Sequence, residues 1–82
     1  MNKNYIEKIK SKLYGALRER EKEGEWENLL DNLVIELSGH YLNEKNDNIL
    51  SIINKLTICK YLSFKYYRKI IFDCMNSLDR LN

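Results

Sequence analysis

The sequence predicts an all-α protein, an antiparallel four-helix bundle formed by a single domain. The 82 residues contain no proline and only three glycines, so few residues interrupt helices. Apolar residues recur at spacings of three and four, which is the period of an amphipathic helix rather than the alternation of a strand. Short connections join four such segments, and this favours antiparallel neighbours. A chain of this length buries roughly 60–65% of the surface that it exposes when unfolded, so we expect one compact core.

The first helix is predicted at residues 3–22. Its apolar side consists of Ile6, Ile9, Leu13, Ala16 and Leu17. The charged run at residues 18–23 alternates in sign, but it places like charges four residues apart, so we interpret it as a solvated helix end. Gly24 follows, and we expect it to close the helix in the left-handed conformation that favours glycine.

The second helix is predicted at residues 25–41, where an acidic start suits the positive end of the helix dipole. Its apolar stripe consists of Trp26, Leu29, Leu30, Leu33, Val34, Leu37 and Tyr41. We interpret Trp26 as a core anchor near one end of the bundle, because its spacing to Leu29 and Leu30 continues the stripe. Gly39 weakens a helix by about 1 kcal/mol relative to alanine, so we expect the helix to stop or fray near Ser38.

The polar residues 43–48 form the clearest predicted loop, and this loop separates two helical hairpins. The third helix is predicted at residues 48–60 with Asn46, Asp47 or Asn48 as its cap, and the fourth at residues 64–81 with Ser63 as its N-cap. The apolar side of the third helix consists of Ile49, Ile52, Ile53, Leu56 and Cys59, and that of the fourth consists of Phe64, Tyr67, Ile70, Ile71, Cys74, Leu78 and Leu81.

The net charge of +2 is unevenly distributed, because the middle of the chain is acidic and both ends are basic. Such a pattern joins neighbouring helices or leaves a basic face for an acidic partner or a membrane surface. No apolar run reaches the roughly 18–20 residues of a membrane span, and the first residues lack the apolar stretch of a secretory signal. We therefore expect a cytoplasmic protein.

Cys59, Cys74 and His40 are the side chains best suited to metal or redox chemistry. The cysteines are fifteen residues apart and the single histidine lies in another segment, whereas structural zinc sites use close pairs of ligands. We interpret both cysteines as reduced core residues, with a disulfide between the last two helices as the alternative. His40 lies beside a predicted helix end, which favours a surface or capping role. The chain has no phosphate loop, nucleophile motif or acid pair, so we expect neither enzymatic activity nor a cofactor.

The start of the fourth helix is the most informative segment for function. Residues 62–71 combine an aromatic cluster with cations and contain no acid. Tyrosine and arginine often carry binding energy in interfaces, so we predict a partner-binding surface on the side that faces away from the core. The alternative is an ordinary solvated face whose cations balance the acidic second helix. The predicted partner-binding residues are Lys60, Lys65, Tyr66, Arg68 and Lys69, and Lys55 could extend the surface.

Four stretches, in order along the chain, underlie a resemblance to a known family. They are Ser11–Tyr14, Asn28–Leu33, Ile52–Leu56 and Leu62–Tyr67, and a leucine-containing C-terminal helix follows them. In the order and character of its helices the chain resembles the enterocin A type bacteriocin immunity proteins over nearly its whole length. The resemblance implies a small, basic, cytoplasmic four-helix bundle that protects a bacterium from its own pediocin-like peptide. Many members carry a C-terminal tail beyond the fourth helix, whereas here we expect that helix to end the chain.

The resemblance also implies a mechanism and a partner. Members of the family associate from the cytoplasmic side with the mannose phosphotransferase permease once the bacteriocin has engaged it, and they block the resulting pore. Specificity is assigned to the C-terminal half, which here corresponds to residues 55–82. We therefore expect a membrane permease in complex with a bacteriocin as the partner, peripheral contact with the membrane, and no small-molecule substrate.

Two other classes of function remain open. The first is a small DNA-binding regulator, in which the third and fourth helices form a helix-turn-helix and the cationic start of the fourth reads DNA. Turns of that motif commonly contain glycine and residues 59–62 contain none, so we do not expect a nucleic-acid partner. The second is a homodimeric or phage-encoded adaptor that binds another helical protein.

Overall fold

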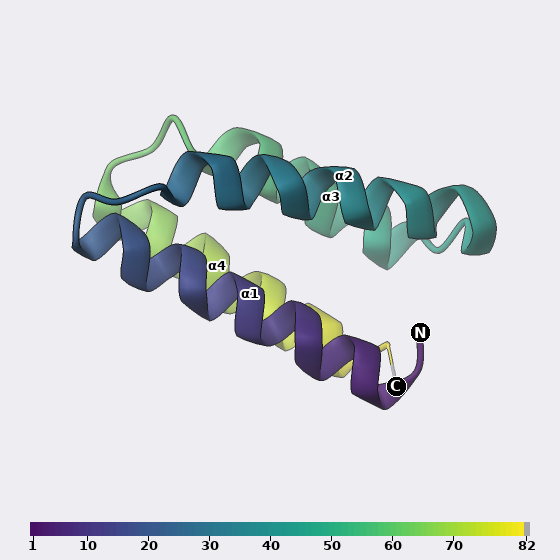
Figure 1. The fold of residues 1–82 in the computed structure, drawn as a ribbon. Helices are drawn as coiled ribbons and strands as arrows, with labels where there is room; N and C mark the ends of the chain where they lie inside the picture. Colours follow the sequence, from purple (N-terminus) through teal and green to yellow (C-terminus); the bar gives the residue numbers. More distant parts are fainter. Residues whose placement is uncertain (82) are drawn as a thin grey trace.

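The computed structural model describes residues 1–81 and folds them into four α-helices (Figure 1). These are α1 (Lys3–Glu21), α2 (Trp26–Glu44), α3 (Asp47–Cys59) and α4 (Phe64–Asp79). None of the described residues belongs to a strand. The predicted all-α four-helix bundle is confirmed, and α1, α3 and α4 begin and end within two residues of their predicted bounds.

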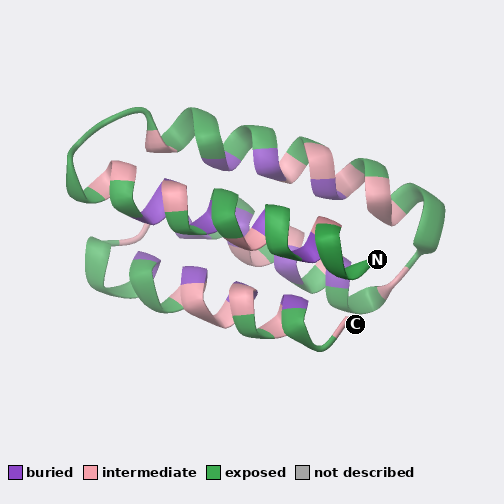
Figure 2. Ribbon diagram, turned by 60° about the horizontal axis from the view of Figure 1, so that its bottom comes forward, coloured by how far each residue is buried: buried purple, intermediate pink, exposed green. Residues whose placement is uncertain are grey.

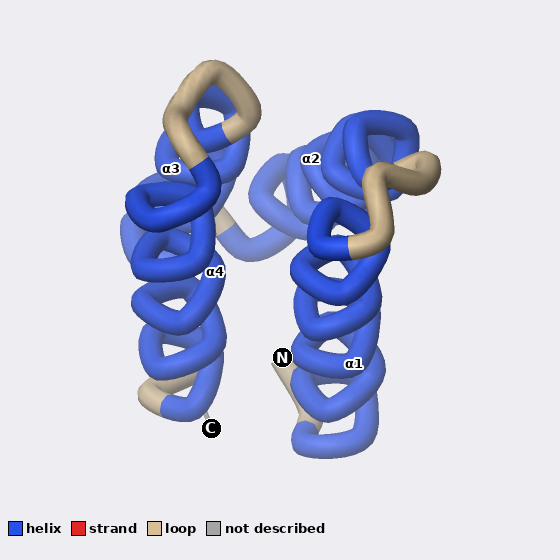
Figure 3. Tube along the Cα trace, turned by 90° about the vertical axis from the view of Figure 1, so that its left-hand side faces the viewer, coloured by secondary structure: helices blue, strands red, loops and turns tan. Residues whose placement is uncertain are grey.

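The helices form a ring in which each one packs against two others. Consecutive helices are in contact, and α1 also contacts α4, which closes the ring. Short connections at residues 22–25, 45–46 and 60–63 reverse the chain, so consecutive helices run antiparallel (Figure 1). Viewed from one end, the four helices occupy the corners of a square (Figure 3). The α1–α2 and α3–α4 turns therefore share one end of the bundle.

One apolar core fills the space between the helices. Buried positions face the interior on every helix, and exposed positions cover the outside (Figure 2). Among residues 1–81 the buried side chains are all hydrophobic, with no polar or charged residue among them. Tyr67, Ile6, Leu37, Ile52 and Ile71 are among those that are entirely or almost entirely removed from water. The hydrophobic effect therefore supplies the main driving force for the fold.

Three residues of the predicted apolar stripes lie further out than expected. Leu29 is 36% exposed and Phe64 is 37% exposed, so the prediction that both face the core was wrong, while Trp26 is half-buried. Leu29 borders a hollow at the α1–α2 groove, where the facing Gly15 has no side chain to cover it. Phe64 is the first residue of α4 and lies at the end of the bundle, where no further helix covers its ring.

The turn after α1 differs from the prediction by one residue. Gly24 does not adopt a left-handed conformation; Glu23 does, with a φ of 60°. The helix ends at Glu21 with Lys22 as its cap, so the left-handed position falls on the next residue, before the glycine. The Gly24 N–H then donates to the carbonyl oxygen of Glu19 at 2.7 Å and closes the turn.

The second helix is longer than predicted, because α2 continues through Gly39 to Glu44. The predicted loop at 43–48 is reduced to Lys45 and Asn46. Lys45 takes a φ of 56°, and its N–H donates to the carbonyl oxygen of Tyr41 at 2.7 Å, which closes the helix. Tyr41 packs against the core, and such tertiary contacts override the modest cost of glycine in a helix.

The helix starts follow the predicted capping chemistry in part. The Asn46 side chain accepts a hydrogen bond from the Asn48 N–H at 2.8 Å and caps α3, as expected. Ser63 occupies the N-cap position of α4, but its side chain makes no capping hydrogen bond.

None of the four helices, over the described residues, has the length and apolar character that crossing a membrane requires.

Candidate partner-binding site

The start of α4 presents four of the predicted partner-binding residues on one side of the bundle. Tyr67 and Ile71 are fully buried and fix which side of α4 faces the core. Lys65, Tyr66, Arg68 and Lys69 are then all exposed on the outside; we call these four residues the α4 face.

Two cations of the α4 face each lie over an aromatic ring of their own helix. The Lys65 ammonium is 6.0 Å from the Tyr66 ring centroid, and the Arg68 guanidinium is 4.9 Å from that of Phe72. Within residues 1–81, no carboxylate lies within 4.0 Å of Lys65, Arg68 or Lys69. Their charges are therefore open to an external acidic group.

Lys60, the fifth predicted residue, does not join the α4 face. Its ammonium donates to the Asp31 carboxylate of α2 at 3.3 Å, and this hydrogen bond raises the Lys60 pKa. Lys60 therefore points toward the side of α3 that faces α2.

Lys55 is partly buried on the side of α3 that faces α4. Burial raises the pKa of the Cys74 thiol to about 12, and the nearby charge of Lys55 opposes that rise.

Tyr67 and its neighbours position the α4 face. The Tyr67 hydroxyl donates to the carbonyl oxygen of Ala16 in α1 at 3.0 Å, and burial raises the Tyr67 pKa. The Trp26 ring packs edge-on against the Tyr67 ring, with 5.2 Å between centroids. Because these contacts come from α1 and α2, they hold the start of α4 against these two helices.

Arg20 completes this cluster, although the charged run in which it lies did not indicate that it packs against aromatic rings. Its guanidinium lies 4.3 Å from the Trp26 ring centroid and 4.4 Å from that of Tyr67. Its Nη2 donates to the carbonyl oxygen of Leu62 at 2.6 Å and so ties α1 to the α3–α4 turn. The interpretation of residues 18–23 as a solvated end was therefore wrong for Arg20. The signal that could have found it is its place four residues after Ala16, on the edge of the apolar stripe.

An acidic hollow borders the α4 face at the same end of the bundle. It is lined by Arg20, Glu21, Glu23, Gly24, Trp26, Glu27 and Phe64. Three of these residues are glutamates, and Phe64 directly precedes Lys65 of the α4 face in the sequence. This end of the molecule therefore carries both acidic side chains, around the hollow, and basic side chains, on the α4 face.

Both cysteines are buried and have free thiols, so the disulfide alternative does not describe this structure. Burial raises the pKa of Cys59 to about 11. The thiols therefore stay protonated near neutral pH, when they behave as small apolar groups. Among the described residues, no three His, Cys, Asp or Glu side chains are grouped closely enough to hold a metal ion.

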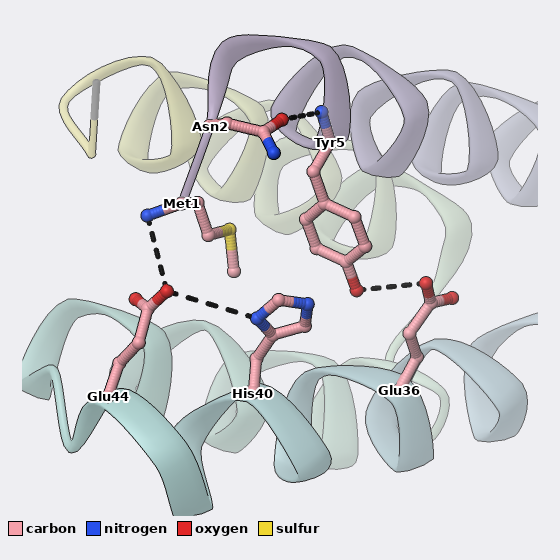
Figure 4. A network of polar contacts seen from close by, with 6 residues as sticks. All are labelled: Met1, Asn2, Tyr5, Glu36, His40 and Glu44. Atoms are coloured by element: carbon pink, nitrogen blue, oxygen red, sulfur yellow. Dashed lines mark hydrogen bonds and ion pairs between the residues drawn. The ribbon is translucent and has the colours of Figure 1, made fainter.

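His40 lies near the end of α2, in a polar contact region between α1 and α2 (Figure 4). The start of α4 is at the other end of the bundle (Figure 1). Its ring packs against that of Tyr5 with 4.1 Å between centroids, and its Nδ1 lies 4.0 Å from the Glu44 carboxylate. The Tyr5 hydroxyl donates to Glu36 at 2.8 Å, and Lys12 donates to the other oxygen of Glu36 at 2.7 Å. His40 is thus a partly buried packing residue, and the predicted surface or capping role describes it poorly.

Glu36 should make the stability of the bundle depend on pH. The hydrogen bond from Lys12 lowers the Glu36 pKa, burial opposes this, and the Tyr5 hydroxyl adds to the lowering. A carboxyl with a lowered pKa stabilises the fold above its unfolded-state pKa, and this contribution is lost as the pH falls through the folded-state pKa. Glu36→Gln should therefore reduce the free energy of unfolding by about 1 kcal/mol at pH 7 and by almost nothing near pH 2.

Urea denaturation at several pH values checks this expectation. Glu21→Gln is the matched control, because Glu21 is exposed and makes no ion pair within the described chain. A loss of stability for Glu36→Gln that stayed constant from pH 7 to acid would show that the ionised carboxylate is not what stabilises this region.

Comparisons of the chain with protein-family models, with curated proteins and with solved structures find no match. The resemblance to bacteriocin immunity proteins therefore stays a prediction.

Proposed function

We propose that this protein is a bacteriocin immunity protein that acts by binding another protein and performs no catalysis. The observation that supports this most is the α4 face, where three cations that have no carboxylate partner among residues 1–81 share the exposed side of the helix start with an exposed tyrosine. Exposed arginine and tyrosine on a rigid support are the residue types that carry energy in interfaces.

The partner in this proposal is the mannose phosphotransferase permease in complex with a pediocin-like bacteriocin, approached from the cytoplasmic side. Acidic groups on cytoplasmic loops of the permease would pair with Lys65, Arg68 and Lys69, and bound protein would block the pore. Anionic lipid next to the permease would add attraction of about 1 kcal/mol for each nearby Lys or Arg. The protein would then be cytoplasmic and would contact the inner face of the membrane only when bound.

Charge reversal at the α4 face tests the proposal. The chain is expressed in a bacterium that is sensitive to pediocin-like peptides, and a panel of these peptides is titrated against the cells. We expect the parent chain to protect against one or a few peptides, and the triple variant Lys65→Glu, Arg68→Glu, Lys69→Glu to lose most of that protection. Because all three residues are exposed, the variant should keep its helix content in circular dichroism.

The matched control changes the net charge equally at another place. Lys3, Lys8 and Arg18 are exposed on α1, and their simultaneous replacement by glutamate should leave protection intact. Equal protection by the folded α4-face variant would remove this face from the mechanism. No protection by the parent chain against any peptide, with the protein present in the cytoplasm, would reject the immunity function itself.

The same cations could bind nucleic-acid phosphates, but the arrangement of the helices does not favour a helix-turn-helix. The two helices of that motif cross at roughly 90–120°, whereas α3 and α4 run antiparallel within the bundle (Figure 1). Binding to duplex DNA that weakens steeply with salt would support that function instead.

A further inference from the structure

The groove between α2 and α3, on a different face from the α4 face, exposes large apolar side chains. It is lined by Asp31, Val34, Ile35, Thr57, Lys60 and Tyr61; we call these residues the α2–α3 groove. Ile35 is 70% exposed and Tyr61 is 79% exposed, and Leu42, two turns after Ile35 on α2, is 69% exposed. Most of the surface of these three large side chains is therefore in water, and exposed apolar surface of this kind often marks an interaction site.

Four polar side chains on this face, those of Asp31, Ser38, Thr57 and Lys60, already have partners within the chain. The Thr57 hydroxyl donates to the carbonyl oxygen of Ile53 at 2.8 Å, and that of Ser38, between Ile35 and Leu42, donates to the carbonyl oxygen of Val34 at 2.7 Å. The charges of Asp31 and Lys60 pair with each other at 3.3 Å. Covering the face would therefore leave the hydroxyls of Thr57 and Ser38 and the charges of Asp31 and Lys60 with partners, so removing water from the apolar side chains beside them is favourable.

The distribution of charge indicates what covers the groove. The acid, Asp31, lies on α2 and the base, Lys60, lies on α3, at the same end of the groove. A two-fold axis parallel to the helices would place α2 of one copy against α3 of a second copy, with the same ends together. Asp31 would then face Lys60 of the other copy twice, and each Ile35 would face the other Tyr61. The surface thus complements itself, as a two-fold interface requires.

We infer that the α2–α3 groove is a dimer interface, and that its occupant is a second copy of this chain. This inference goes beyond the proposed function and uses another face, so the two fail separately. The interface buries Ile35, Leu42 and Tyr61 and exchanges the Asp31–Lys60 pairs between copies. It leaves Lys65, Arg68 and Lys69 open in both copies.

Sedimentation equilibrium of the full chain, over about 5–500 μM, tests the dimer. We expect the mass to rise from that of the 9.9 kDa chain to twice that value across this range. Ile35→Glu should weaken the association at least about tenfold, because it places a carboxylate in the apolar centre of the interface. Ile35 is exposed in the single chain, so the variant should still fold. Tyr14→Glu is the matched control: Tyr14 is 48% exposed on α1, which does not contact α3, and this variant should dimerise like the parent.

A charge-exchange experiment tests the arrangement of the two copies. Asp31→Lys gives a chain with two bases in the groove, and Lys60→Asp gives a chain with two acids, so each variant alone should be mostly monomeric at concentrations where the parent is dimeric. An equal mixture should recover a one-to-one dimer, because the bases of one chain then face the acids of the other. A parent chain that stays monomeric throughout, an Ile35→Glu variant that dimerises as the parent does, or a mixture that fails to recover the dimer would overturn the inference.

Discussion

Replacing Tyr67 with alanine should destabilise the bundle by about 4 kcal/mol, the largest effect that we expect from a single side chain. Tyr67 has no exposed surface and is the largest side chain that the core buries completely. Its ring contacts Trp26 from α2 and Arg20 from α1, so truncation opens a cavity where three helices meet. A chain of this size has a total stability of only about 4–12 kcal/mol, so the substitution should remove at least about a third of it.

Tyr67→Phe separates the contribution of the ring from that of the hydroxyl. It removes the hydrogen bond to the carbonyl oxygen of Ala16 and keeps the packing. We expect it to cost about 1 kcal/mol. Thermal unfolding followed by circular dichroism measures both variants. Near-parental stability of Tyr67→Ala would mean that the contacts of this ring do not hold α4 in place.

Arg20→Ala should give the second-largest effect, a loss of about 2–3 kcal/mol, although arginine side chains on helices normally contribute little. Its guanidinium lies against two aromatic rings, and each such contact contributes about 0.5–1 kcal/mol or more when it is partly buried. The hydrogen bond to the carbonyl oxygen of Leu62 adds about 1.5 kcal/mol, because its donor is charged. Against this, Nη1 is buried and has no hydrogen-bond partner within the described residues, which reduces the net benefit.

Arg18→Ala is the matched control, because Arg18 is exposed and lies two residues earlier on the same helix. It should change stability by no more than about 0.5 kcal/mol. Arg20→Lys should recover less than half of the loss, since an ammonium cannot lie flat against both rings. Trp26 is the single tryptophan, so its fluorescence during urea denaturation reports directly on this cluster. Similar losses for Arg18→Ala and Arg20→Ala would show that the cluster does not stabilise the end of the bundle.

These two residues link the fold to the candidate site. Tyr67 turns the apolar side of α4 inward and thereby turns Lys65, Arg68 and Lys69 outward. Arg20 fixes the α3–α4 turn from which that helix starts. A conservative change at either residue that keeps the chain folded is therefore expected to disturb the α4 face, although neither residue belongs to that face.

The sequence by itself determined the number of helices, the apolar stripe of α1 and the cap of α3. Ile6, Ile9 and Leu13 are all buried as their spacing predicts, and Asn46, one of the three predicted caps, caps α3. These features depend on residues within about one or two turns of each other. Periodicity and capping are local, so the chain specifies them without reference to other helices.

Only the tertiary structure decided how side chains from different helices meet. It placed Arg20 between two rings of α2 and α4, and it drew Lys60 to Asp31 and away from the α4 face. It also let α2 continue past Gly39, because Tyr41 beyond it found a place against the core. Each of these outcomes depends on the offset and close packing of one helix against another, and the spacing of residues along a single helix shows which side is buried but not which partners that side meets.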